Sequence, residues 1–534
     1  MNKRRYAIII LLSVVIIGVT TGAYFISTPT EEPTDSTKQV GYWKGVTATD
    51  DISTQNGYVS KDDSEEFIYR AIARTEEIRG EPFQQDISVE ITTREEHRED
   101  NPFQQQAQSY EKWSDTIWSG MLVVPRQESV QEIQTEFANE NVLAYYLISQ
   151  DKLIVVADEE TETGYYIDEA TLIHELGHAL QDQRMGLNRD PINSEVTTIR
   201  QTNLSLIEGE SSLYEQKFQE RCQTEWECVE TPLKHRSESY DGTYTGFRQL
   251  SVAPYDVGLE YINTEANGNW DELDEIYESN SLYRSRQLHY ETENPQEVVK
   301  AQDISSNQWS LTTSRGMNGR DVLGLHGMAA ILTHYNEEYD IEIPYPDQTQ
   351  SEFQSPYLQT YESDSFAPYT DASNRQGFVW TIRWSSPESA EQFEEIYISA
   401  IQSTGGYIVE DPDYSIPEDS VDNHTVLSGG GEFQGAYSIT RNESMLTITS
   451  APVVTDLQEI RPTQLEPRIV NEYQTTTLSE PEYEITSVED RESEEITAGE
   501  NQQQIPESVI IILRILAVIV FVTLYVYIDG KVRD

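Results

Sequence analysis

Positively charged residues are scarce in this chain of 534 residues. Lys and Arg together number 36, against 94 Asp and Glu, so the formal net charge is -58 at pH 7. Such a chain repels a phosphate backbone, and the composition therefore argues against nucleic-acid binding. The acidic excess is spread along the sequence, where its self-repulsion strains a compact state in ordinary salt. Because the Debye length falls to about 3 Å in molar salt, we expect the chain to be halophilic.

Cysteine is nearly absent, which excludes a disulfide-rich scaffold and any zinc site built from four thiolates. The two cysteines, Cys222 and Cys228, are separated by only five residues. Outside the cell, such a pair is expected to form a short local disulfide. A zinc site is the alternative, but two lone thiolates have no further ligands nearby in the sequence.

Long hydrophobic runs are missing between residues 28 and 507. The two exceptions flank this stretch, at residues 6–27 and 508–528, and each is long enough to cross a bilayer as a helix. Lys3, Arg4 and Arg5 precede the first run and predict a cytoplasmic N-terminus. A signal anchor is favoured, with a cleaved signal peptide as the alternative. We therefore predict a membrane protein with two transmembrane helices, located in the cell membrane with its large domain extracellular.

Histidine is also rare, yet two of the 8 histidines stand in the string His174-Glu175-Leu176-Gly177-His178. On a helix, positions i and i+4 share one face, so both imidazoles can bind one metal ion. Glu175 then lies close enough to take a proton from a metal-activated water. Apolar neighbours on both sides of the string predict a partly buried helix, in which two histidines and a glutamate need a partner.

Catalytic zinc requires a third protein ligand, and no histidine follows at a suitable spacing. Glu208, on the next predicted helix at about residues 194–220, is the preferred ligand, with Glu210 as the alternative. Asp182 is one turn beyond His178 and is a candidate to orient its imidazole. An oxyanion donor is also needed. Nothing in the sequence chooses among four candidates for it: Tyr165, Tyr166, His289 and His326.

The segment from His174 to Gln183, followed by Ile207-Glu208-Gly209-Glu210, resembles the zincin-like metallopeptidases of bacteria and archaea. In that family, a similar helix is followed by a Glu-Gly-Asp-Ala stretch. The resemblance extends over roughly residues 60–220. The ligand pattern that it implies is similar to that of the gluzincin type. It implies zinc held by His174, His178 and Glu208, with Glu175 as the base. With the acidic composition, it suggests a haloarchaeal surface protein.

Local patterns predict several elements around this motif. Residues 64–78 have helical periodicity, residues 87–91 alternate as a strand, and Thr93 with Glu96 forms a capping box. Residues 142–149 and 153–157 predict a β-hairpin directly before the histidine helix.

The predicted fold class is α+β: a zincin-like metallopeptidase domain and a second α/β lobe, flanked by N- and C-terminal transmembrane helices. The predicted segments are a cytoplasmic tail 1–5, a signal anchor 6–27, a linker 28–60, the catalytic domain 61–235, a mainly helical subdomain 236–345, a small α/β lobe 346–455, an acidic stalk 456–507, a transmembrane helix 508–528 and a tail 529–534.

The function expected from these observations is a membrane-anchored zinc metallopeptidase that hydrolyses exported or envelope proteins. Its partners would be a protein or peptide substrate and the membrane. The alternative is a non-catalytic surface protein on a zincin scaffold. The sequence does not indicate an oligomeric state.

Overall fold

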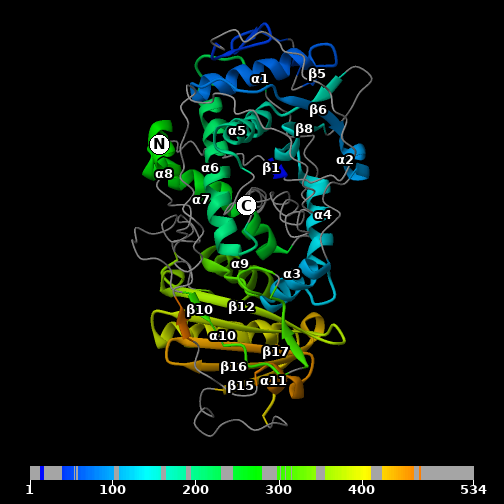
Figure 1. The fold of residues 1–534 in the computed structure, drawn as a ribbon, viewed down its shortest axis with the longest axis vertical. Coiled ribbons are helices and arrows are strands. Elements are labelled where there is room, and N and C mark those ends of the chain that lie inside the picture. The colour runs from blue at the N-terminus through cyan, green and yellow to red at the C-terminus, as the bar shows by residue number, and fades with distance from the viewer. Residues whose placement is uncertain are drawn as a thin grey trace, which may run out of the picture.

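The fold was analysed in a computed structural model, whose elements are arranged in an elongated body (Figure 1). The structure describes residues 13–16, 39–52, 54–55, 58–100, 108–157, 164–187, 194–229, 244–278, 298–300, 302–306, 308–313, 315–343, 355–410, 424–461 and 468–470.

A four-stranded mixed sheet lies at one end of the body. Its order is β1 (Ser13–Ile16), β7 (Ala144–Leu147), β8 (Lys152–Ala157) and β6 (Ser88–Thr93). β7 and β8 are antiparallel, whereas β1–β7 and β6–β8 are parallel pairs. Helix α5 (Glu169–Met185), which carries the histidines, packs on this sheet, and α1 (Ser64–Arg79) packs on α5. Helix α5, which carries the motif, therefore lies between the sheet and α1 in a layered core.

Several local predictions in this region are confirmed. The predicted hairpin is β7–β8, joined by the 3-10 turn η1 (Ile148–Gln150), and the predicted helix 64–78 is α1. The capping box opens α2 (Arg94–Asp100), since the Thr93 backbone donates to Glu96 and the Glu96 backbone donates to the Thr93 hydroxyl. These elements depend on short-range patterns, which the sequence displays directly.

The middle of the body is helical. Helix α6 (Thr197–Cys222) runs from the level of α5 toward α9 (Gly324–Tyr339), as Figure 1 shows. α6 packs along α7 (Thr245–Glu265), and α7 packs on α9. The remaining helices of this region are α3 (Gln108–Gly120), α4 (Val130–Asn141) and α8 (Trp270–Glu278).

A seven-stranded sheet forms the other end of the body. Every strand pair in it is antiparallel. One face packs on α10 (Pro387–Ser403) and α9, and the other on α11 (Val454–Ile460). Its order is β11 (Trp309–Leu311), β12 (Tyr361–Asp371), β13 (Gln376–Trp384), β17 (Met445–Ala451), β16 (Gly435–Asn442), β15 (His424–Gly429) and β14 (Tyr407–Ile408). The short helices η5 (Leu358–Thr360) and η7 (Gly431–Phe433) flank these strands.

Two predicted boundaries of this lobe need correction. β11 belongs to the sheet although it lies in the predicted helical subdomain, before residue 346. The predicted stalk from 456 begins inside α11, whose Leu457 and Ile460 are buried against the sheet. Further along, β18 (Arg468–Val470) pairs with β10 (Val298–Lys300). A polar composition concealed these elements because only a few apolar residues anchor each of them.

The predicted linker 28–60 is likewise partly folded. It contains β2 (Tyr42–Trp43), β3 (Val46–Thr47), β4 (Thr54–Gln55) and β5 (Tyr58–Ser60), and β5 pairs with β9 (Gly164–Tyr166). Trp43 and Val59 are buried in the core that surrounds α1 and α5. This segment therefore belongs to the domain that carries the motif.

The predicted flanking transmembrane helices are wrong as a description of the fold. Among the described residues, no helix is both long and apolar enough to span a membrane. Within the predicted anchor 6–27, Ser13–Ile16 forms strand β1 beside β7. A run of apolar residues is compatible with a buried strand as well as with a helix, and its periodicity does not decide between them. The second predicted span, 508–528, lies outside the described residues.

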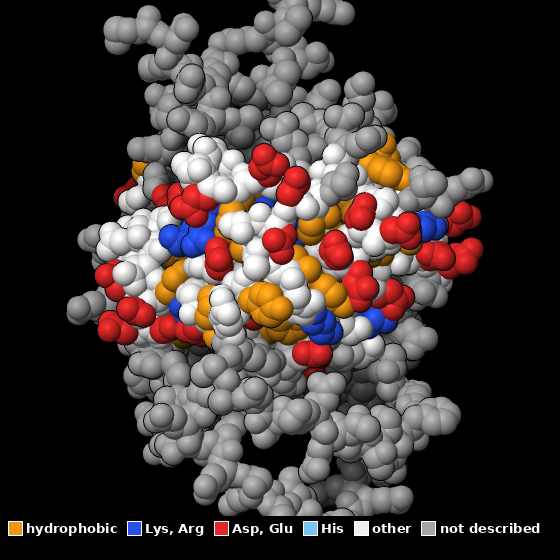
Figure 2. Space-filling view, turned by 90° about the horizontal axis from the view of Figure 1, so that it is seen from above, with side chains coloured by type: hydrophobic (Ala, Val, Ile, Leu, Met, Phe, Trp, Pro, Cys, Tyr) orange, Lys and Arg blue, Asp and Glu red, His pale blue; other side chains and the backbone are white. Residues whose placement is uncertain are grey.

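The acidic excess is visible on the surface. Figure 2 views the end of the body that carries α1 and shows Asp and Glu scattered over the coloured part of this face, with fewer Lys and Arg between them. No single acidic tail accounts for the charge, which agrees with a fold adapted to high salt.

Candidate metal centre

Helix α5 holds the motif in a fully enclosed position. The helix begins at the N-cap Asp168, whose carboxylate accepts a hydrogen bond from the Thr171 backbone at 2.9 Å. His174, Glu175 and His178 each have 0% exposed surface. Their ligand atoms lie within 4.8 Å of one another, so the three side chains surround one small volume.

Helix α6 brings Glu208 to both histidines. Its Oε2 lies 3.2 Å from His174 Nε2 and 3.1 Å from His178 Nε2. Tetrahedral zinc, with bonds of about 2.0–2.1 Å, separates its ligand atoms by about 3.3 Å. The Glu208 oxygen is therefore spaced from each of the two nitrogens much as two ligand atoms of one zinc ion are. The alternative ligand Glu210 has other partners, because its carboxylate binds Gln181 Nε2 at 2.9 Å and Arg184 Nη1 at 3.3 Å.

The polar partners of Nδ1, on the far side of each ring, favour metal binding through Nε2. Gln181 donates its amide to the Ile207 carbonyl and to Glu210, which fixes its orientation and turns Oε1 toward His178 Nδ1 at 2.9 Å. An amide oxygen only accepts, so the Nδ1 atom of His178 carries the proton and Nε2 is left as a ligand. Similarly, His174 Nδ1 faces Glu215 Oε2 at 3.7 Å. Such partners orient histidines that bind metals.

Three residues of α6 contact the histidines from one face of that helix. Glu208, Ser211 and Glu215 follow the spacing i, i+3, i+7, and Ser211 Oγ lies 3.0 Å from His178 Nδ1. The sequence predicted Glu208 as a ligand but did not indicate Ser211 and Glu215 as partners of the site. Helical spacing from Glu208 was the signal that could have identified them.

The charges of this cluster are strongly coupled. Burial lowers the pKa of His174, but hydrogen bonds with Glu208 and Glu215 outweigh it and raise the pKa to about 9. Burial raises the pKa of Glu208, yet the charge of His178 and the bonds from both histidines lower it to about 2. A histidine cation and a glutamate anion thus persist at neutral pH, and binding of a cation at Nε2 would release a proton.

Asp182 does not orient His178, contrary to the prediction. Its two oxygens accept hydrogen bonds from the Tyr146 hydroxyl at 3.1 Å and from the Leu187 backbone at 2.6 Å. The reason is the direction in which each side chain leaves α5: Asp182 faces strand β7, whereas Gln181 faces α6. The neutral amide of Gln181 therefore has the role that the sequence assigned to a carboxylate.

This correction gives a paired prediction. Gln181→Leu removes the amide acceptor of His178 Nδ1, leaving Ser211 Oγ as its remaining partner, and is expected to weaken zinc binding by about 10- to 100-fold, the usual effect of losing such a partner. Asp182→Asn, one residue further, is expected to leave zinc affinity unchanged. Competition titration against a chromophoric chelator measures both variants. Equal losses in the two would contradict the assignment.

The described candidates for the oxyanion donor are divided between strand β9 and helix α9. Tyr165 and Tyr166 are in β9, against Lys61 and Tyr58 respectively. His326 is buried in α9 with Nε2 at 3.4 Å from Ser205 Oγ, and burial lowers its pKa to about 3. His289 lies outside the described residues.

A tyrosine that the sequence did not mark lies at the site instead. The Tyr255 ring of α7 is 5.8 Å from the His174 ring, and its hydroxyl is hydrogen bonded to Glu208. Burial is the largest cause that raises the pKa of Tyr255 well above its usual value, and the negative charges of Glu208 and Glu175 raise it further. The hydroxyl therefore stays protonated and can serve as a donor. Nothing in the local sequence distinguishes Tyr255 from other helical tyrosines.

Glycines set how closely these helices approach. A Cβ on Gly209 would lie 2.4 Å from the backbone of Gly258, so this pair brings α6 against α7 and Tyr255 with it. A Cβ on Gly177 would lie 2.9 Å from the Tyr214 ring and 3.1 Å from Ser211 Oγ. Gly177 therefore permits the contact between α5 and α6 at the level of the histidines.

Gly177→Ala is consequently expected to destabilise the fold by about 1–3 kcal/mol through overpacking. At an uncrowded helical position, the same change would stabilise by about 0.5–1 kcal/mol. The sign of the change in the free energy of unfolding, measured by denaturant titration, distinguishes the two cases. A more stable variant would show that the helices do not require glycine there.

The cysteines lie beside α1. Cys222 and Cys228 are joined by a disulfide, which links the C-terminal end of α6 to the following loop. Nearby, Arg74 binds Glu169 and the Glu227 carbonyl. Arg74 thereby connects the loop that the disulfide closes to Glu169 at the start of α5.

Comparison with known proteins assigns no activity to this site. The model of a domain of unknown function, DUF8575, matches residues 311–461. This match includes α9 and most of the seven-stranded sheet but none of the residues on α5 and α6. No curated protein and no solved structure matches the chain.

Proposed function

We propose that the chain is a zinc-dependent metallopeptidase, with zinc held by His174, His178 and Glu208. The observation that carries the proposal is the position of Glu208 Oε2, within 3.2 Å of Nε2 of both histidines. Four acidic side chains are enclosed here: Glu175, Glu208, Glu210 and Glu215. Arg184 balances Glu210, and a divalent cation would offset two of the three remaining negative charges.

The chemistry follows from the residues around that position. Zinc, when bound, polarises a carbonyl and lowers the pKa of water to about 7. Glu175 is placed to take the proton from the attacking water and to deliver it to the leaving amine. Tyr255 can donate a hydrogen bond to the oxygen of the substrate carbonyl as negative charge develops on it. Gln181 and Glu215 keep the imidazoles oriented throughout.

The negative net charge and the disulfide support a location outside the cytoplasm. A disulfide persists in oxidising compartments, and a net charge of -58 is tolerated best where salt is high. We propose an extracytoplasmic enzyme that acts on proteins or peptides.

The decisive experiment combines metal analysis with a peptide-hydrolysis assay on the full-length protein, purified in high salt. The proposal requires about one zinc per chain and hydrolysis that a chelator abolishes and added zinc restores. Zinc without hydrolysis of any peptide in a mixed library would favour the non-catalytic alternative. Absence of zinc from the folded protein would refute the metal centre itself.

A further inference from the structure

A pocket lies beside the candidate metal centre, along the same two helices. It contains about 620 Å³ of empty space, counting the part that is open to solvent. Its lining on α6 reaches Leu204 and on α7 reaches Ser251. Glu208 and Tyr255 follow these residues by four positions on their helices. Because four residues make about one helical turn, the pocket ends one turn from the proposed zinc ligand Glu208 and from Tyr255.

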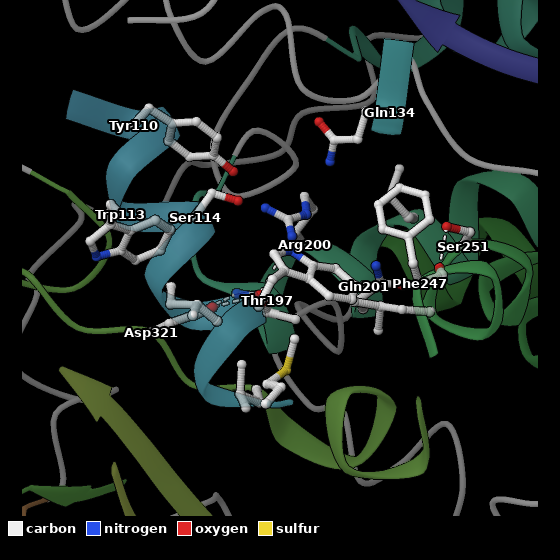
Figure 3. Close-up of a pocket in the computed structure, with 16 residues that line it drawn as sticks. Tyr110, Trp113, Ser114, Gln134, Thr197, Arg200, Gln201, Phe247, Ser251 and Asp321 are labelled. Atoms are coloured by element: carbon white, nitrogen blue, oxygen red, sulfur yellow. Dashed lines mark hydrogen bonds between the residues drawn. The ribbon is translucent and has the colours of Figure 1, made fainter. Parts of the chain in front are cut away.

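The walls of the pocket are mostly apolar, and four of the lining residues are aromatic. Tyr110, Trp113 and Trp118 come from α3 and Phe247 comes from α7, and Figure 3 labels Tyr110, Trp113 and Phe247 around the pocket. Apolar walls with a few polar groups between them are typical of ligand sites. Two of these polar groups, Arg200 and Gln201, are adjacent on α6.

Gln201 has an unusual position for an amide. It has 0% exposed surface, and neither its Oε1 nor its Nε2 has a hydrogen-bond partner among the described residues. Leaving a buried amide without partners costs about 1–3 kcal/mol per group. Gln201 precedes Glu208 by seven residues, so it lies on the same face of α6, about 10 Å away along the helix. An amide in this position can bind a ligand that enters the pocket.

Arg200 provides a positive charge beside this amide. Among the described residues, its guanidinium contacts the Glu195 carbonyl and the Thr197 hydroxyl, both at 3.5 Å, and is hydrogen bonded to Tyr110. The nearby Asp321 is already bound by the Thr197 backbone and hydroxyl, each at 2.6 Å, and Glu195 is bound by Arg315 at 3.1 Å. Within the described part of the chain, no carboxylate lies within 4.0 Å of Arg200. Figure 3 shows the guanidinium among Tyr110, Ser114 and Gln134.

We propose that this pocket binds a carboxylate of the peptide substrate, through Arg200 and the amide of Gln201. A guanidinium is the side chain best suited to hold a carboxylate, and the Gln201 amide adds a further donor. About 10 Å corresponds to three extended residues, so the carboxylate would lie within about three residues of the cleaved bond. It can be the C-terminus of the substrate or an Asp or Glu side chain. This inference rests on the proposed function, since it takes the metal centre as the place of cleavage.

The test measures binding rather than catalysis. The full-length Glu175→Gln protein is titrated with three peptides: acetyl-tetraalanine with a free C-terminus, its C-terminal amide, and acetyl-Ala-Ala-Glu-Ala-amide. Fluorescence of the pocket tryptophans reports binding, and calorimetry verifies it. We expect at least one carboxylate peptide to bind about 10- to 100-fold more tightly than the neutral amide, the range for hydrogen bonds to a charge. Preference for the free C-terminus identifies the chain end as the source, whereas preference for the Glu peptide identifies a side chain.

The variants separate this inference from the proposed function. Arg200→Gln and Gln201→Met should each reduce the preference for a carboxylate, and Arg200→Lys provides a charged variant should the first fail to fold. Arg248→Gln, on α7 and paired with Glu337, is the matched control and should retain the preference. Equal binding of all three peptides, or a preference that survives Arg200→Gln, would overturn the inference. Repeating the titration after zinc removal shows whether the pocket binds carboxylates even if the proposed hydrolysis fails.

Discussion

Replacement of Glu175 by glutamine is expected to lower peptide hydrolysis by about 10²- to 10⁴-fold, the contribution of a positioned proton acceptor. The substitution keeps the shape of the side chain and removes its basicity. Since the proposed ligands are His174, His178 and Glu208, the zinc content of the variant should remain about one per chain. The comparison requires initial rates and metal analysis on the same preparation.

Glu220→Gln is the matched control for this experiment. Glu220 is an exposed residue near the end of α6. Glu220→Gln therefore changes the net charge and the composition as Glu175→Gln does, but it leaves the site untouched. Its activity should equal that of the unmodified protein. If Glu175→Gln retained full activity together with zinc, Glu175 would not be the base.

The second large effect concerns the choice of the third ligand. Glu208→Gln is expected to reduce the zinc content from about one ion to nearly none, because two histidines alone do not hold catalytic zinc. Glu210→Gln, two residues away, should keep its zinc, since Glu210 binds Gln181 and Arg184 rather than the Nε2 atoms. Metal analysis after dialysis measures both variants, and hydrolysis should follow the zinc content.

The reverse pattern, with zinc lost from Glu210→Gln and kept by Glu208→Gln, would contradict the geometry. Thermal unfolding of each apoprotein in high salt controls for misfolding. Removal of Glu208 also leaves two buried histidines without their carboxylate, so a lower melting temperature is expected for that variant.

The sequence predicted the elements whose determinants are local. The hairpin before α5, the capping box at Thr93 and Glu96, and helix α1 each depend on patterns within a few residues. Glu208 could also be predicted from the sequence. Helical spacing places it on one face of its helix, and the resemblance to zincin-like metallopeptidases makes it the candidate third ligand. The structure then brings this residue to both histidines.

The rest depends on which elements pack together, and short patterns carry no such information. Gln181 rather than Asp182 contacts His178 because α6 lies on one side of α5 and β7 on the other. Tyr255 reaches the site only because Gly209 and Gly258 allow α6 and α7 to touch. Similarly, an apolar run was interpreted as a membrane helix, whereas Ser13–Ile16 pairs with β7 as a strand.

X-ray absorption at the zinc edge, on the full-length protein in high salt, is the most direct test of the central claim. For the proposed centre we expect one zinc with only nitrogen and oxygen ligands at about 2.0–2.1 Å, including imidazole scattering from two histidines, and no bound zinc in a His174→Ala, His178→Ala double variant. A spectrum with sulfur ligands at about 2.3 Å, or a folded protein that takes up no zinc, would contradict it.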